Sequence, residues 1–567
     1  MKDWSVERRE FLATGLAGLA AVPASAEGQA QKEGETRIDI ADAHAHFFNG
    51  ADLPAAAFIR YVVAPVYLAN APDVLLAIID IGVNVLKRLS ITADDELRRM
   101  SPPWRDGDDV SIKDFAEGMV AAAEAQINRR GFVGELKRRP LDDVADSYYA
   151  LATLIEDERA RLGGLSKPAE KALSASAEQQ RFEVARSIDQ PTLERILAEG
   201  GDLLDTGPHW YLDRGLSPAD IWAVLKWARV MAQSRSAHVR RYLETMTSDR
   251  TRTTLAVNLL IDFDQWLGER PKDGSDQERQ VAFWSAYARA AAGRIRIETF
   301  AAYDPLKHVE QMLAGGPTSF EASKGWALAG PQATHRVTGF KLYPPMGFNV
   351  SANQPLPSGD AAGGARIVRD RWKQKGWDVD RLPALLDDAL DTFFAFCVEH
   401  DIPLFAHARD SNMSFPGGGL NAHPQYWLDR AKRMADANPR RPVRACLGHY
   451  SPEDFGFDDA MEKILDLNAA GRARIYFDLS FDEHILKDVA TAAERLKHVE
   501  RICTAHKNGA DYMMFGTDWI MLGQRPRHQK YVANLMAAID GNIFWKERRE
   551  KLLGGNLRTF LTRIPPG

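Results

Sequence analysis

Short apolar runs occur along the chain in two arrangements. The first run, 38–41, precedes an interval from about residue 50 to residue 250, in which apolar residues recur at helical spacing between polar turns. From residue 250 onward, runs typical of buried strands alternate with segments of helical periodicity, such as 382–400 and 452–467. These later strands are predicted at 255–261, 295–301, 337–342, 403–406, 443–447, 475–479 and 512–515.

With the run at 38–41, this pattern predicts an α/β fold, a TIM-like parallel (β/α)8 barrel with a large helical insertion after its first strand. The alternative is an open, doubly wound sheet, but no Gly-x-Gly-x-x-Gly follows an early strand. The triglycine at 417–419 lacks a phosphate-binding lysine, so we interpret it as a pliable loop.

The insertion, 51–250, separates the two barrel segments, 27–50 and 251–567. Its clearest helix begins at Ser217 and Pro218, an N-cap serine followed by a proline in the first turn. Because the insertion leaves from the end of the first strand, we expect it above the same face of the barrel as that strand end. A substrate-selecting cap and an oligomerisation module, which would make the protein a homo-oligomer, are both open hypotheses.

The N-terminus carries Arg8-Arg9, a mild apolar segment at 13–22 and a small-x-small ending at Ala26. This resembles a twin-arginine export signal, which predicts a mature, periplasmic protein in a bacterium. The alternative is an uncleaved amphipathic tail. No stretch is apolar enough for stable membrane insertion, since the nearest, 74–86, is short and contains Asp80.

Charge and cysteine content narrow the function classes. The chain has 72 Lys and Arg residues against 78 Asp and Glu residues, without long single-sign blocks, which gives no indication of a nucleic-acid partner. A small-molecule substrate is the expected partner. The three cysteines, Cys397, Cys446 and Cys503, lie in apolar runs and are predicted to be buried thiols.

The first strand ends in Asp42-Ala43-His44-Ala45-His46. Two imidazoles two residues apart on an extended chain point to the same side, so both can reach one cation. An isolated His-x-His is weak support, because surface histidines are common. The motif therefore predicts a metal site only if other ligands join it.

Four further strands end in residues that can bind metal or titrate: Lys341, His407, His449 and Asp518. Each has a structural alternative, such as a solvated strand end, a core histidine or a helix N-cap. That all four residues stand at strand ends is harder to explain by chance, since the carboxyl ends of barrel strands converge on one face. We therefore predict a shared site.

In combination, these segments resemble the amidohydrolase superfamily, in particular the amidohydrolase-related branch that includes carboxymuconate-semialdehyde decarboxylase-like enzymes. The resemblance covers the mature chain except the insertion, and no single segment is specific. The matching segments are DAHAH at 42–46, GFKL at 339–342, AH at 406–407, HPQYW at 423–427, LGH at 447–449, FGTDW at 515–519 and GNL at 555–557.

Imidazoles and a carboxylate suit Zn²⁺, although other divalent metals are open. The resemblance implies His44, His46 and Asp518 as ligands of a first metal, with His407 joining them or binding a second metal. Water on such a cation ionises near neutral pH, and Asp518 is the candidate to accept its proton. His449 is then either a ligand of the second metal or a group that polarises the substrate carbonyl.

The chemical form of Lys341 determines whether the site would hold one metal or two. An ammonium beside Zn²⁺ is repelled, so a lysine there has a lowered pKa and can form a bridging carbamate, as in some superfamily members. Otherwise Lys341 stays an amine that binds a substrate oxygen. Arg409 and Tyr343 lie two residues beyond strand-end site residues, and His423 follows the triglycine. We expect these three to contact the substrate, with loop packing as their alternative.

The first function hypothesis is a metal-dependent hydrolase of an amide, ester or lactone bond in a small molecule. The alternative is a Zn-dependent, non-oxidative decarboxylase or related lyase acting on an unsaturated or aromatic carboxylic acid. A third is an exported binding protein without catalytic activity. The insertion has no interpretable motif, so the sequence leaves the substrate open.

Overall fold

The computed structural model describes residues 37–58, 61–62, 83, 85–100, 110, 114, 117–118, 229–358, 363–411, 413–453, 456–525 and 527–563. The predicted export signal, the helix predicted from Ser217 and most of the predicted insertion lie outside these residues.

Eight parallel strands form one sheet in which each strand pairs with the next along the chain. Their order and positions confirm the predicted (β/α)8 barrel, with strand ends that differ from the predicted ones by a few residues. The strands are β1 Ile38–Ala45, β2 Thr251–Leu259, β3 Arg296–Ala302, β4 Gly339–Leu342, β5 Leu404–His407, β6 Val443–Gly448, β7 Ala473–Asp478 and β8 Met513–Met514.

The barrel is nearly closed where the chain after β8 meets β1. Ala43 N donates to Phe515 O at 2.9 Å, and Asp518 N donates to His44 O at 2.7 Å. A parallel bridge between Ala45 and Trp519 extends the contact. These backbone bonds bring the first and last predicted site segments side by side.

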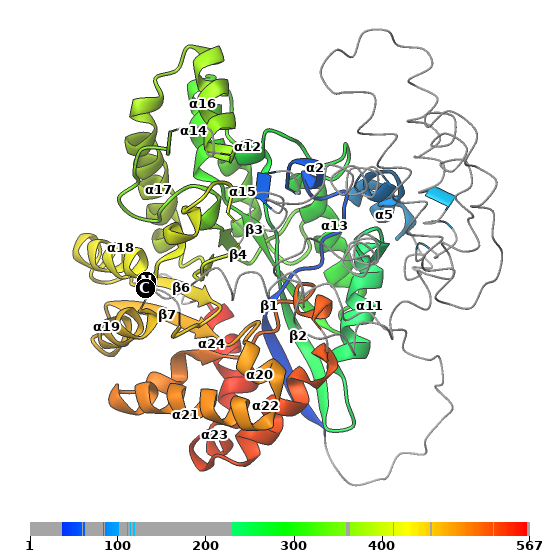
Figure 1. Cartoon of the computed structure of the whole chain (residues 1–567), viewed down its shortest axis with the longest axis vertical. Coiled ribbons are helices and arrows are strands. Elements are labelled where there is room, and N and C mark those ends of the chain that lie inside the picture. Colours follow the sequence, from blue (N-terminus) through cyan, green and yellow to red (C-terminus); the bar gives the residue numbers. More distant parts are fainter. Residues whose placement is uncertain are drawn as a thin grey trace, which may run out of the picture.

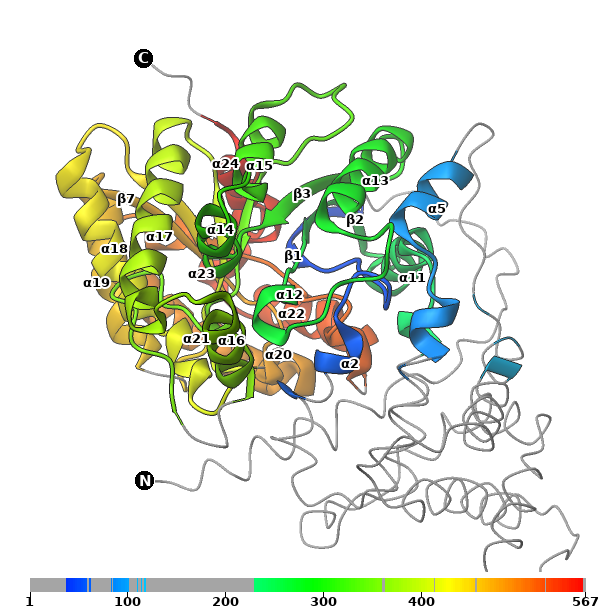
Figure 2. The ribbon, with the colours of Figure 1, turned by 90° about the horizontal axis from the view of Figure 1, so that it is seen from above.

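Helices surround the strands, with α17, α18 and α19 on one side and α11 and α13 on the other (Figures 1 and 2). The predicted helix at 382–400 matches α17. The helix predicted at 452–467 begins later, because Gly456 directly before it has a left-handed φ of 60°. The α-helices are α2 Ala55–Phe58, α5 Ala93–Arg99, α11 Arg235–Met246, α12 Asp264–Leu267, α13 Gln277–Ala290, α14 Pro305–Leu313, α15 Ser319–Leu328, α16 Gly363–Lys375, α17 Leu382–Glu399, α18 Pro424–Ala437, α19 Phe457–Ala469, α20 Glu483–Lys487, α21 Val489–Ala505, α22 Tyr531–Asp540, α23 Ile543–Glu547 and α24 Asn556–Leu561.

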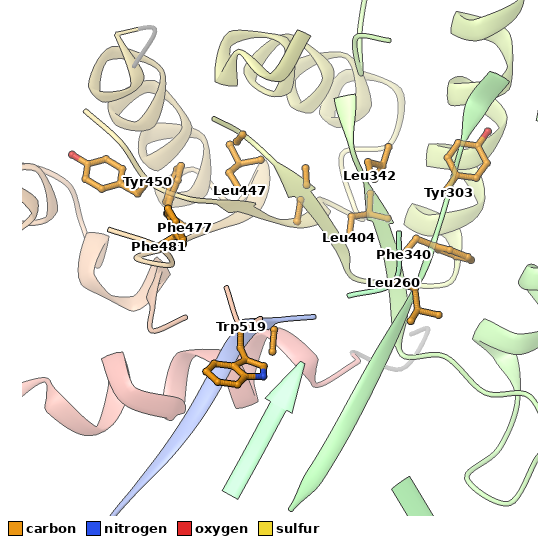
Figure 3. Close-up of a cluster of buried hydrophobic side chains, with 14 of the residues drawn as sticks. Leu260, Tyr303, Phe340, Leu342, Leu404, Leu447, Tyr450, Phe477, Phe481 and Trp519 are labelled. Carbon is orange, nitrogen blue, oxygen red and sulfur yellow. The ribbon is translucent and has the colours of Figure 1, made fainter. Parts of the chain in front are cut away.

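Side chains that alternate along the strands build two cores. One set, which includes Leu342, Leu404 and Leu447, belongs to the larger core that also contains the buried faces of the helices (Figure 3). The intervening set, which includes Phe405, packs inside the barrel against Phe560 of α24. Because side chains alternate with a period of two, the strands deliver every second residue to the interior.

This alternation positions Lys341. It stands between Phe340 and Leu342, which both belong to the larger core. Its ammonium therefore enters the barrel and lies 4.9 Å above the ring of Phe405. Only 2% of Lys341 is exposed, so it is not the solvated strand end of the alternative interpretation.

The described ends of the predicted insertion are fixed to the barrel. The guanidinium of Arg235 in α11 is fully buried and bonds Asp52 and Glu96, the latter at 2.9 Å. Further along α11, Tyr242 donates to Asp42 of β1 at 2.8 Å. Helix α11 thus belongs to the layer around the strands, while the division of the chain at 51 and 250 stays a prediction.

All three cysteines are free and buried, which confirms their prediction as buried thiols. Across the described ranges, the helices are too short or too polar to cross a bilayer.

Candidate metal centre

Two imidazoles from β1 are oriented by hydrogen bonds on one nitrogen each. His44 Nδ1 lies 3.0 Å from Asp478 Oδ2, and His46 Nδ1 lies 2.7 Å from the carbonyl oxygen of Leu259. A nitrogen that faces an oxygen acceptor carries the proton, so in both neutral rings Nε2 keeps its lone pair. Metal-binding histidines are commonly held this way.

Both Nε2 atoms face the carboxylate that follows β8. Asp518 Oδ1 lies 3.3 Å from His46 Nε2 and 3.6 Å from His44 Nε2. Among the described residues, these three side chains form a buried group whose ligand atoms all lie within 4.8 Å of one another. Buried imidazole and carboxylate groups at this spacing can hold a divalent cation.

Asp518 and His449 adopt strained backbone conformations. Their φ angles are 58° and 64°, in the left-handed region that residues with a Cβ seldom occupy. Such conformations cost on the order of 1 kcal/mol or more and concentrate at functional sites. Here they turn the two side chains toward the same centre from the ends of β8 and β6.

Considering only the described ranges, three buried polar atoms at the centre lack a hydrogen-bond partner: His44 Nε2, His407 Nε2 and Lys341 Nζ. Leaving such atoms unpaired costs about 1–3 kcal/mol each in a folded core. A cation that accepts the imidazole lone pairs would remove part of that cost. The residues present therefore fit a metal ion, although they do not identify which metal.

His407 and His449 extend the site beyond the three-ligand group. The rings of His407 and His449 have centroids 4.6 Å apart, and those of His449 and His44 are 4.4 Å apart. His407 is oriented by a hydrogen bond to the backbone of Arg409. The structure thus brings together His44, His46, Asp518, His407 and His449, with His407 and His449 outside the three-ligand group.

Asp478 and Ser480 are site residues that the sequence analysis missed. Asp478 ends β7, is fully buried and accepts from His449 N at 3.0 Å, in addition to its contact with His44. Ser480 Oγ lies 3.0 Å from Nδ1 of both His44 and His449. The sequence did contain a signal for Asp478, because this carboxylate follows the apolar run 475–477 at a strand end. The four predicted strand-end residues were identified in the same way. His44, His449 and Asp478 also form a second group of possible ligands. We favour the first, since Asp478 already binds His44 Nδ1.

Asp42, the first residue of the 42–46 motif, stabilises the centre through hydrogen bonds without being one of its proposed ligands. Its carboxylate accepts from His44 N at 2.9 Å, Thr517 N at 3.0 Å, Thr517 Oγ1 at 2.5 Å and Tyr242 at 2.8 Å. Burial raises the pKa of Asp42 to about 7 even though these hydrogen bonds lower it. Asp42 therefore ties β1, the loop after β8 and α11 together around the two imidazoles.

Glycines allow the strands to approach the His44 ring. A Cβ on Gly448 would lie 2.7 Å from His44 Cε1, closer than real side chains come. A Cβ on Gly516 would lie 3.0 Å from His44 Cβ. Both glycines precede predicted site residues, which gives a physical reason for the glycines in LGH and FGTD.

Burial sets the charge state of the centre. It lowers the pKa of His44, His407 and His449 well below the ordinary histidine value, so all three rings are neutral near pH 7. It also lowers the pKa of Lys341 to about 8, while Asp478 and Asp518 act in the opposite direction. At pH 7 about a tenth of Lys341 is therefore an uncharged amine, far more than for an ordinary lysine.

The three residues expected to contact a substrate have different surroundings. The Tyr343 ring lies 4.6 Å from the His407 ring, tilted by 33°, and lines a small pocket with Lys341. Arg409 is half-buried and donates to Phe481 O at 3.4 Å. His423 caps α18, with Nδ1 accepting from Gln425 N at 3.0 Å. Tyr343 thus lies next to the centre, and substrate contact by all three stays a prediction.

No family model matches this chain, and no curated protein is similar enough to match it. The amidohydrolase resemblance therefore rests on the motifs quoted above.

Proposed function

We propose that this protein is a metal-dependent hydrolase that cleaves an amide, ester or lactone bond in a small molecule, with Zn²⁺ as the metal. The observation that carries the proposal is the orientation of the two β1 imidazoles. Their Nδ1 atoms are occupied by Asp478 and by the Leu259 carbonyl, so their Nε2 atoms converge beside Asp518. Folding alone gives no reason to leave His44 Nε2 buried and unpaired.

His44, His46 and Asp518 would hold the cation, with His407 as a possible fourth ligand from β5. When bound, Zn²⁺ polarises a carbonyl oxygen and lowers the pKa of water to about 7. Asp518 lies at the centre of this set, so its carboxylate takes the proton from the attacking water and returns it to the leaving group.

His449 and Lys341 act on the substrate in this proposal. His449 Nδ1 faces the carbonyl and hydroxyl oxygens of Ser480, so Nε2 of the neutral ring keeps its lone pair and can ligate a second metal, whereas polarising the substrate carbonyl requires the protonated ring. Lys341, whose pKa is about 8, would either bind a substrate oxygen as an amine or react with carbon dioxide, losing a proton, to give a carbamate that could hold two metals. The number of metal ions bound per chain distinguishes between the amine and the carbamate roles of Lys341.

The test uses the full protein, loaded with Zn²⁺ and stripped by a chelator, against a panel of esters, anilides and lactones. Metal analysis is expected to give one or two Zn²⁺ per chain, and hydrolysis is expected to disappear on stripping and return on reloading. Asp518→Asn is expected to lose activity by about 100-fold or more, since general acid–base catalysis contributes that much. Asp511→Asn is the matched control, because Asp511 pairs with the exposed Lys551.

Full activity in Asp518→Asn would refute the proton role, and a chain that binds no metal would refute the proposal. Release of carbon dioxide from an unsaturated or aromatic acid, without hydrolysis of any panel member, would favour the decarboxylase hypothesis instead.

A further inference from the structure

A cluster of three carboxylates lies beside the metal centre, at the ends of β2 and β3. Asp262 and Asp264 follow β2, and Asp304 follows β3. One ammonium faces them: Lys307 Nζ lies 2.7 Å from Asp262 and 3.1 Å from Asp264. Among the described residues, Lys307 pairs with two of the three acids and leaves the third, Asp304, without a cationic partner.

Within the part of the chain that the structure describes, Asp304 is the member of the cluster without a cationic partner. Its Oδ1 accepts from Trp266 Nε1 and from Leu306 N, both at 3.0 Å. Its Oδ2 has no hydrogen-bond partner, although the residue is only 7% exposed. Burial, and then the charges of Asp262 and Asp264, raise the pKa of Asp304 well above its ordinary value, which favours its protonated form until a cation approaches it.

One small pocket joins this cluster to Lys341, at the edge of the candidate centre. Asp262 and Asp304 line it together with Lys341, whose unpaired amine is 2% exposed. Trp266 and Tyr343 supply aromatic walls between the two ends. Carboxylates next to aromatic faces attract organic cations through charge and through the ring quadrupole.

We propose that Asp304, supported by Asp262 and Asp264, forms a subsite for an ammonium group of the substrate. The inference rests on the proposed function, because it assigns the substrate that the metal centre acts on. A divalent metal suits the cluster less well. Lys307 already occupies the point where Asp262 and Asp264 converge, and a hard cation needs about six oxygen ligands. One free carboxylate oxygen suits a single N–H donor.

Binding is measured without turnover, by calorimetry on the full, zinc-loaded protein with n-butylammonium chloride and with n-butanol as its neutral counterpart. The ammonium is expected to bind about tenfold more tightly, the value of one charge-assisted hydrogen bond. Asp304→Asn keeps an oxygen for the α14 cap and is expected to remove that preference. Glu298→Gln, which neutralises a buried acid on the same strand, is expected to keep it.

Equal binding of the two probes by the wild-type protein would overturn the proposal, as would an undiminished preference in folded Asp304→Asn. If Asp304→Asn does not fold, Asp262→Asn replaces it, and the wild-type comparison stands by itself. Hydrolysis of neutral esters without ammonium binding would refute the subsite and leave the proposed function intact. Ammonium binding without hydrolysis would support the subsite while the proposed function fails.

Discussion

Asp478→Asn tests how the imidazoles are oriented. Asp478 Oδ1 accepts from His449 N at 3.0 Å and Ser480 N at 2.9 Å, while Oδ2 faces His44 Nδ1 at 3.0 Å. An asparagine keeps the Oδ1 bonds and places an NH₂ group against His44 Nδ1. The ring then protonates on Nε2 and loses the lone pair that a metal needs.

The expected loss of zinc affinity follows from this single substitution. Since one charge-assisted hydrogen bond is lost, about 1.5–3 kcal/mol, zinc affinity is expected to fall about 10- to 100-fold. The measurement is the zinc dissociation constant, from competition with a fluorescent chelator. Asp458→Asn is the matched control, because Asp458 contacts His498 Nε2 at 2.8 Å away from the centre. A dissociation constant for Asp478→Asn within about threefold of wild type would refute the orientation argument.

The remaining predictions concern the surroundings of the centre. Gly448→Ala places a Cβ 2.7 Å from His44 Cε1, so zinc affinity is expected to fall on the order of tenfold in the same chelator assay. Tyr242→Phe removes the 2.8 Å hydrogen bond to the buried Asp42 carboxylate and is expected to lower the free energy of unfolding by about 1.5–3 kcal/mol, measured in urea. Burial lowers the pKa of His238 to about 3, below its unfolded value of about 6.5, so the unfolded state takes up the proton first. The stability gained from neutral His238 is complete above pH 6.5 and is lost as pH falls toward 3. Between pH 7 and pH 5 the wild-type protein is expected to lose about 2 kcal/mol more than His238→Asn.

Each of these has a control or a contradicting result. Gly325→Ala, where a Cβ meets nothing within 4 Å, is expected to leave zinc affinity unchanged. An unfolding free energy of Tyr242→Phe equal to that of wild type would show that water replaces the hydroxyl. Parallel pH profiles for wild type and His238→Asn would show that His238 is not the titrating group.

Local sequence determined the barrel and most of the candidate centre. Strands and helices have different apolar periods, so the run at 38–41 and the alternating pattern after residue 250 were together sufficient to predict eight parallel strands. Barrel strands also end on one face, which is why Lys341, His407, His449 and Asp518 could be predicted to meet His44.

Tertiary structure alone decided which atoms face one another. The free nitrogen of His44 depends on Asp478, 434 residues away in sequence, and no local pattern connects them. The lowered pKa of Lys341 depends on burial inside a closed barrel. The carboxylates at the ends of β2 and β3 share a pocket with Lys341 only because β2, β3 and β4 are neighbours in the sheet. Residue type and period follow from the sequence, whereas charge state, tautomer and pairing depend on distances through space that only the folded barrel sets.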